Sequence, residues 1–168
     1  MQTAEEPEPP NRRHIPTRIV SGGQTGVDRG ALDAAIAVGI DHGGWCPRGR
    51  RAEDGTIPSR YRLQELDDPG YPARTEQNVI DSDATLILYR DQLVGGTLLT
   101  KRLCQKHRMR HRCFSVSEGN ASPAQAIAAW LDEIRADCLN VAGPRESSAP
   151  GIQVETEQLI TRVLARAT

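Results

Sequence analysis

The sequence predicts an α/β protein: a three-layer sandwich in which helices cover both faces of a parallel sheet of five or more strands. Three observations lead to this prediction. Short apolar runs alternate with helical patterns, and such alternation produces parallel strands joined by right-handed crossovers. The run 85–89 is β-branched and apolar, as expected of a strand covered on both faces. Glycine-rich turns separate several strands from the helices that follow.

Each element follows from a local pattern. Strands are expected at residues 18–20, 41–45, 85–89, 113–116 and 138–142. Apolar residues one helical turn apart predict helices that begin near Val27, Gly95, Pro123 and Ile152, and Gly39 ends the first of them. Residues 46–73 are polar and exceed the ~12 to 15 residues of an ordinary loop, so we expect short helical turns or a functional role there.

Length and composition indicate one domain. The chain has 168 residues, a formal net charge of -1 and 38% hydrophobic residues. A chain of this size buries roughly 70% of its unfolded surface, enough for a core without disulfides or a structural metal. The first residues are acidic and rich in proline. We therefore expect a tail over residues 1–15 and a single domain over residues 16–168.

Three turns rich in glycine and hydroxyl residues are the strongest chemical signal. They cover residues 21–26, 95–97 and 143–148. Because each follows a strand of a parallel sheet, all three should lie at one edge of it. Helix N-termini offer unpaired N–H groups, and glycine lets an anion approach them, so the turns predict a phosphate cradle. The alternative is that they only connect elements, and neither dinucleotide nor P-loop fingerprints identify the ligand.

The chain also carries a series of separated motifs. They are RIVSGGQTGVDRGALDA (18–34), GWCP (44–47), AEDGTIP (52–58), RTEQNV (74–79), DSDATLI (81–87), GGT (95–97) and PRES (144–147). In this order they resemble the molybdenum cofactor carrier protein family, over nearly all of residues 19–164. The resemblance implies a Rossmann-like homo-oligomer that binds a phosphate-bearing pterin, the molybdenum cofactor, at the sheet edge. Molybdoenzymes would be the recipients of that cofactor.

That family is similar in fold to nucleotide sensors and to lysine decarboxylase-like phosphoribohydrolases. Those enzymes carry P-G-G-x-G-T-x-x-E, in which the glutamate acts at the glycosidic carbon. Aligned on Gly96 and Thr97, this chain has Thr100 at the glutamate position, and threonine cannot relay a proton near neutral pH. We therefore expect binding without catalysis and assign no catalytic residue. A nucleotide-processing enzyme and a nucleotide-binding sensor are the alternatives, with a nucleotide as ligand.

The candidate binding residues come from the three turns, the polar stretch and the segment before the strand at 85–89. They are Gly22, Gly23, Gln24, Thr25, Gly26, Asp28, Arg48, Arg51, Thr75, Asn78, Gly95, Gly96, Thr97, Thr100, Arg145, Glu146 and Ser147. Several have simpler explanations. Asp28 could only complement a helix dipole, and Arg48 and Arg51 could be solvated loop charges. Thr75 and Asn78 precede an expected helical turn and could only cap it.

Other classes of site are not favoured. His107 and His111 would share a helix face near Cys104, but basic residues crowd this segment, so we predict no metal site. The near-zero net charge argues against nucleic-acid binding. No apolar run approaches the ~18 residues of a membrane span, and no signal peptide is evident. We expect a cytoplasmic protein whose ligand is a small phosphate-bearing molecule.

Overall fold

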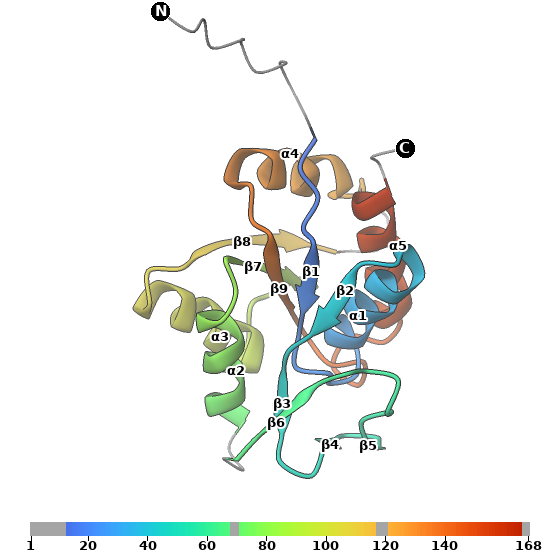
Figure 1. Cartoon of the computed structure of the whole chain (residues 1–168), viewed down its shortest axis with the longest axis vertical. Coiled ribbons are helices and arrows are strands. Elements are labelled where there is room, and N and C mark those ends of the chain that lie inside the picture. Colours follow the sequence, from blue (N-terminus) through green and yellow to red (C-terminus); the bar gives the residue numbers. More distant parts are fainter. Residues whose placement is uncertain (1–12, 68–70, 117–120, 166–168) are drawn as a thin grey trace, which may run out of the picture.

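The centre of the fold is a parallel sheet (Figure 1). The computed structural model describes residues 13–67, 71–116 and 121–165, and within them this sheet has five strands. The strands are β1 (Arg18–Val20), β2 (Asp41–Gly43), β7 (Ala84–Tyr89), β8 (Arg110–Ser115) and β9 (Cys138–Ala142), in the order β2–β1–β9–β7–β8. Every neighbouring pair is parallel. The predicted fold class is confirmed, and β9 is the middle strand of the sheet.

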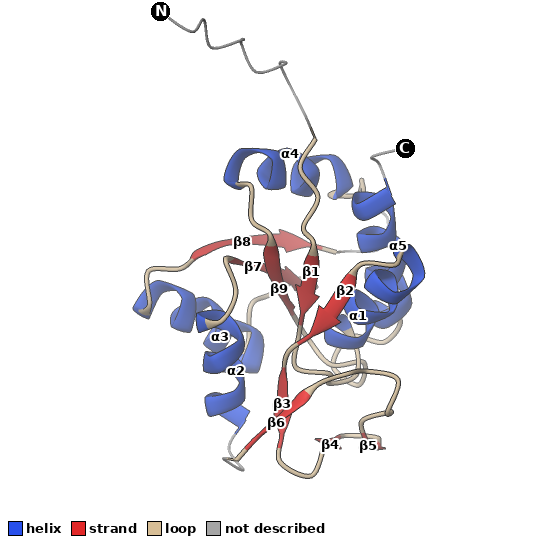
Figure 2. Ribbon diagram, viewed as in Figure 1, coloured by secondary structure: helices blue, strands red, loops and turns tan. Residues whose placement is uncertain are grey.

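Helices lie on both faces of this Rossmann-like sheet (Figure 2). Those among the described residues are α1 (Val27–Val38), α2 (Tyr71–Ile80), α3 (Gly95–Lys106), α4 (Ala124–Ile134) and α5 (Ile152–Leu164). The main core joins α1, α4 and α5 to strand residues such as Ile19, Leu86 and Val141. Val79 of α2 packs with Leu103 of α3 in a smaller core. None of the described helices is long and apolar enough to cross a membrane.

Residues 44–67 differ most from the prediction. The strand expected over 41–45 stops at Gly43, and two small sheets follow. β3 (Trp45–Pro47) pairs in parallel with β6 (Gln64–Leu66), and β4 (Arg51–Ala52) forms a hairpin with β5 (Gly55–Thr56). Ile57 and Tyr61 are buried against Leu32 and Cys46, so this unit has a core of its own. Strands of two or three residues leave no period in the sequence, so short helical turns were expected where the structure has short strands.

Strand β8 also differs from its predicted bounds. It begins at Arg110 rather than at residue 113. Its first half is charged because β8 is an edge strand, where Arg110 and Arg112 are exposed to solvent. His111 therefore lies in a strand, and the helix face that it was expected to share with His107 does not exist.

The last residues of the predicted tail contact the domain. Ile15 packs against the main core. The backbone N–H of His14 donates to Asp132 Oδ1 at 2.7 Å, and its ring Nε2 lies 2.7 Å from the carbonyl oxygen of Ala136. Residues 1–12 of the predicted tail lie outside the described residues.

Candidate functional site

The first turn (residues 21–26) joins β1 to α1 and packs against the third turn (143–148). Gly26 adopts a φ of +86°, and a Cβ atom at this position would lie 2.3 Å from the carbonyl oxygen of Pro144. The N–H of Val27 donates to the same oxygen at 3.2 Å. This approach of two backbones requires glycine and fixes the two turns relative to each other.

A pocket of about 440 Å³ lies at the carboxyl edge of the sheet, within the usual size range of small-molecule sites. All three predicted turns contribute to its lining, so they meet where the strand order places them. The candidate residues that line it are Gly22, Gln24, Asp28, Thr75, Asn78, Gly95, Gly96, Thr97, Thr100 and Arg145.

The pocket carries more positive than negative charge. Its ionisable lining residues are Arg74, Arg90, Arg145, Asp28 and Asp91. The Arg90 guanidinium donates to Pro150 O at 3.0 Å and to Glu155 Oε2 at 2.6 Å. The Nε of Arg90 is buried and makes no hydrogen bond within the described parts of the chain. The two contacts with Pro150 and Glu155 fix the Arg90 guanidinium in the pocket wall.

Two of these arginines were missed by the sequence analysis. Arg90 follows β7 directly, so its position at the carboxyl end of a strand was a usable signal. Arg74 lies in α2, whereas the sequence analysis expected a helical turn only after Asn78. Its only signal was its place in the RTEQNV motif.

Asp28 lies in the first turn of α1 and is buried beside Arg74. Its Oδ2 accepts the N–H of Gln24 at 3.2 Å and lies 3.5 Å from Arg74 Nη1. Burial raises the pKa of Asp28, and this effect exceeds the opposing ones of Arg74, the Gln24 N–H and Arg145. Asp28 therefore does more than complement a helix dipole: it holds the first turn and places a carboxyl group in the pocket wall.

Thr75 and Asn78 lie within α2 rather than before a helical turn, so the capping role considered for them is wrong. Asn78 instead fixes the backbone of β3. Its Oδ1 accepts the N–H of Trp45 at 2.8 Å, and its Nδ2 donates to the Trp45 carbonyl at 2.9 Å. Thr100 lies in α3, where its hydroxyl donates to the Gly96 carbonyl at 2.9 Å.

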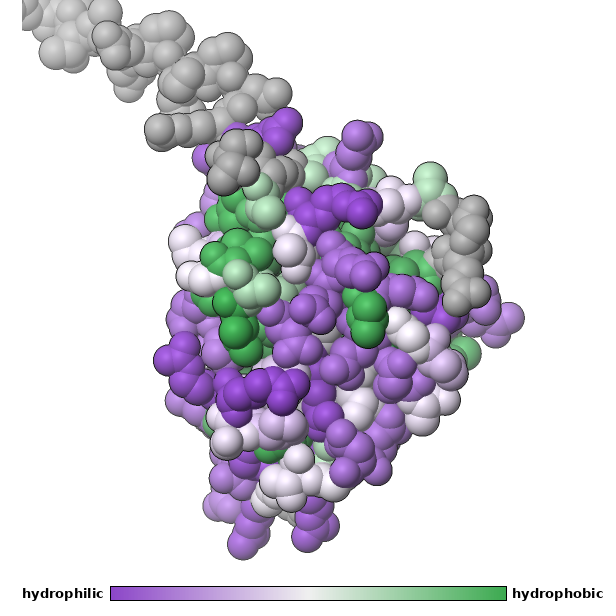
Figure 3. Space-filling model, turned by 90° about the vertical axis from the view of Figure 1, so that its right-hand side faces the viewer, coloured by the Kyte–Doolittle hydropathy of each residue, from purple (hydrophilic) through white to green (hydrophobic). Residues whose placement is uncertain are grey.

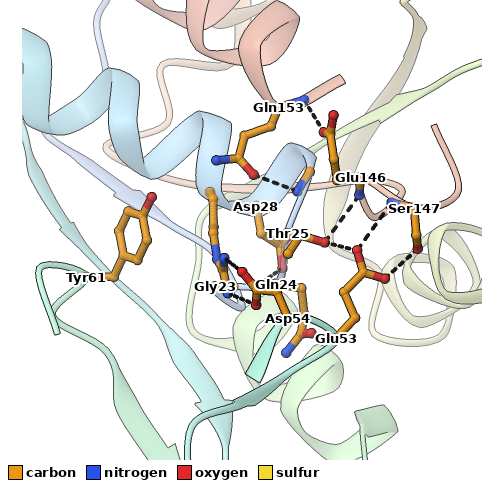
Figure 4. Close-up of polar contacts among 12 residues, drawn as sticks. Gly23, Gln24, Thr25, Asp28, Glu53, Asp54, Tyr61, Glu146, Ser147 and Gln153 are labelled. Carbon is orange, nitrogen blue, oxygen red and sulfur yellow. Dashed lines mark hydrogen bonds and ion pairs between the residues drawn. The ribbon is translucent and has the colours of Figure 1, made fainter. Parts of the chain in front are cut away.

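The remaining candidates of the first and third turns contact one another instead of the pocket (Figure 4). Glu53, at the tip of the β4–β5 hairpin, accepts hydrogen bonds from the hydroxyls of Thr25 and Ser147 and from the Ser147 N–H. The Glu146 carboxylate accepts the N–H groups of Gly151 and Gln153 at the start of α5. Carboxylates of the chain itself thus occupy donors that were expected to bind a phosphate.

Arg48, Arg51 and Gly23 also lie outside the pocket lining. The Arg48 side chain is 69% exposed and 3.8 Å from Asp67. The backbone carbonyl of Arg51 accepts a hydrogen bond from Gln24 Nε2 at 2.9 Å. Gly23 adopts a φ of +74°, and a Cβ there would lie 2.4 Å from Leu63 Cδ1. Backbone conformation and packing thus explain why position 23 is a glycine.

A family model described as the circularly permutated YpsA SLOG family matches residues 19–164. The chain belongs to this SLOG family. A crystal structure from Syntrophus aciditrophicus, of a protein named "Putative molybdenum carrier protein", is 40% identical, with a TM-score of 0.85. The match covers 91% of this chain and 98% of that one. No curated protein matches the chain significantly.

The SLOG relative confirms the resemblance read from the motifs, since its name is that of a molybdenum carrier. It also agrees with the Rossmann-like fold over nearly the whole domain. Residues 13–67, 71–116 and 121–165 of this SLOG chain contain no group of three or more His, Cys, Asp or Glu side chains that could hold a metal ion. His107, which was considered as a metal ligand, instead contacts Glu76. Its Nε2 lies 2.6 Å from Glu76 Oε1, and this contact links the end of α3 to α2.

The Glu53 contacts of this SLOG domain predict a measurable titration. Hydrogen bonds from the Ser147 and Thr25 hydroxyls hold the pKa of Glu53 below its usual 4.5. A carboxyl group whose pKa falls on folding stabilises the fold above its unfolded pKa, and this contribution is lost as the pH falls through the lowered value. In a carboxyl NMR titration we expect a Glu53 midpoint below 4.5, and Ser147→Ala should raise it. A midpoint that is the same in both proteins would contradict the assigned contact.

Proposed function

We propose that this protein is a non-catalytic carrier that binds the molybdenum cofactor by its anionic phosphate end. The observation that carries the proposal is the pocket lined by Arg74, Arg90 and Arg145 at the edge where the three turns meet. Arginine forks match phosphate oxygens in geometry and charge. The name of the 40% identical relative supports the molybdenum part of the proposal.

The N-terminus of α3 adds backbone donors to the same pocket. Gly95, Gly96 and Thr97 line it, and a Cβ atom at either glycine would meet nothing within 4 Å. The residue before them, Val94, has no side chain able to cap the helix and makes no capping hydrogen bond. The first N–H groups of α3 are therefore open to an anion, which the helix dipole would favour.

The absence of turnover is supported by the residue at position 100. Thr100 lines the pocket at the position where the related phosphoribohydrolases carry a glutamate, and its hydroxyl is bonded to the Gly96 carbonyl. It offers neither a charge nor a transferable proton near neutral pH. A threonine in place of that glutamate therefore favours a carrier over an enzyme.

A nucleotide is the competing ligand, because arginines and helix N-termini hold its phosphate equally well. The test is calorimetric titration of the protein with molybdenum cofactor and with AMP, together with an assay for adenine release. We expect the cofactor to bind at least tenfold more tightly and AMP to stay intact. Tighter binding of AMP would indicate a nucleotide sensor, and release of adenine well above the background rate would indicate an enzyme.

We further propose that the carrier is a homo-oligomer, with molybdoenzymes as the recipients of its cargo. Large apolar side chains remain exposed on the monomer, among them Ile36 of α1 and Val154 of α5 at 43% and 57%. Figure 3 shows separate hydrophobic areas among hydrophilic side chains on the face that contains these helices. Light scattering at micromolar concentration should give a multiple of 18.4 kDa, and a monomer mass would contradict the proposal.

A further inference from the structure

The pocket combines an anion-binding lining with a buried carboxyl group. The side chains of Asp28 and Arg74 are only 8% and 11% exposed, and their Oδ2 and Nη1 atoms are 3.5 Å apart. The same Oδ2 accepts the N–H of Gln24, so the carboxyl group is held in place. An anion that approaches Arg74 must therefore enter beside a fixed acidic side chain.

The charged groups around Asp28 come from three parts of the fold. Arg74 of α2 and Arg145 of the third turn act on it directly. Arg90 and Asp91, which follow β7, complete the ionisable lining of the pocket. Burial already raises the pKa of Asp28 against the pull of the two nearer arginines. A dianion bound among these arginines would add a like charge and favour the neutral carboxyl group still further.

We propose that Asp28 makes the pocket selective for oxyanions that bind together with a proton, and that its ligand class is the phosphate monoester. The inference rests on the proposed function, because it assumes that an anion occupies the pocket. A phosphate monoester has a second pKa of about 6 and can bring its own proton, shared between one of its oxygens and the Asp28 carboxylate. Sulfate carries no proton near neutral pH. It must therefore lie beside the charged Asp28 carboxylate, or its binding must be accompanied by uptake of a proton from solvent.

The test compares inorganic phosphate with sulfate by NMR titration at pH 6, at constant ionic strength. We expect the wild-type protein to bind phosphate at least tenfold more tightly than sulfate. In Asp28→Asn the preference should fall to about twofold, because sulfate binds better once the like charge is removed. Asp67→Asn is the matched control: it also removes one carboxylate charge, but from a side chain that is 97% exposed and lies outside the pocket lining, so it should keep the preference.

The outcomes separate this inference from the proposed function. Equal affinities of the wild-type protein for the two anions would overturn the selectivity and leave the anion pocket standing. An unchanged preference in folded Asp28→Asn would do the same. If the wild-type protein binds neither anion, the anion pocket itself is wrong and the inference fails with it. The wild-type ratio needs no variant, so it decides the matter even if Asp28→Asn does not fold.

Discussion

Replacing Gly26 with alanine should lower the free energy of unfolding by about 2 to 6 kcal/mol. The first part of the loss is the backbone conformation, φ +86° and ψ -131°, which lies outside the left-handed helical region and costs a non-glycine residue about 1 to 3 kcal/mol. The second part is overpacking, typically about 1 to 3 kcal/mol. The new Cβ would lie 2.3 Å from Pro144 O and 2.7 Å from Glu146 N. Both are backbone atoms, so no side-chain rotation relieves the contact.

Gly39→Ala is the matched control for Gly26→Ala. Gly39 has nearly the same φ, +84°, but its ψ of +24° places it in the left-handed helical region, and a Cβ there would meet nothing within 4 Å. It ends α1, with its N–H donated to Ala35 and Ile36. The Gly39→Ala variant should lose only the cost of the left-handed helical conformation, about 1 to 2 kcal/mol. Urea denaturation of both variants measures the difference, and equal losses would show that the contact between the first and third turns is not tight.

Arg145→Ala should weaken binding of the molybdenum cofactor about ten- to a hundredfold, equivalent to about 1.5 to 3 kcal/mol. Arg145 lines the pocket from the third turn, and its charge acts on Asp28, which also lines the pocket. Removal of one guanidinium from a site with two others should lower affinity without abolishing it. Calorimetric titration measures the change.

Arg48→Ala is the corresponding control for Arg145→Ala. Its side chain is 69% exposed and lies outside the pocket lining. It removes the same charge from the chain, so it corrects for long-range electrostatics. We expect affinity within about twofold of wild type, since an exposed charge is screened by salt. Similar losses in the two variants would place the ligand elsewhere or show that only net charge matters.

The sequence was most informative where periodicity or strand order decides the structure. The alternation of strands and helices predicted the parallel sheet, and from it followed the meeting of the three turns at one edge. Gly96, Thr97 and Arg145 were placed at the pocket by that argument alone. The sequence analysis did not predict the full length of α2. Only Val79 and Ile80 are strongly apolar among the last residues of this helix, which is too few to reveal a helical period.

Glycines and acidic residues of the turns show why the rest could not be predicted. Gly23 was a candidate for close approach of a phosphate, but its positive φ and its contact with Leu63 explain it without a ligand. Glu53 was not a candidate at all, and yet its carboxylate holds the donors of Thr25 and Ser147. Such contacts join residues far apart in the chain, and no local pattern of residue types indicates them.

The central claim is that the arginine-lined pocket carries molybdenum cofactor. It is tested most directly by native mass spectrometry of the protein, purified without oxygen from cells that synthesise the cofactor. The mass of a single intact molybdenum pterin per 18.4 kDa chain is the predicted result, and the same mass should be much depleted in Arg145→Ala and retained in Arg48→Ala. A nucleotide mass in its place, or a pterin retained equally by both variants, would contradict the account.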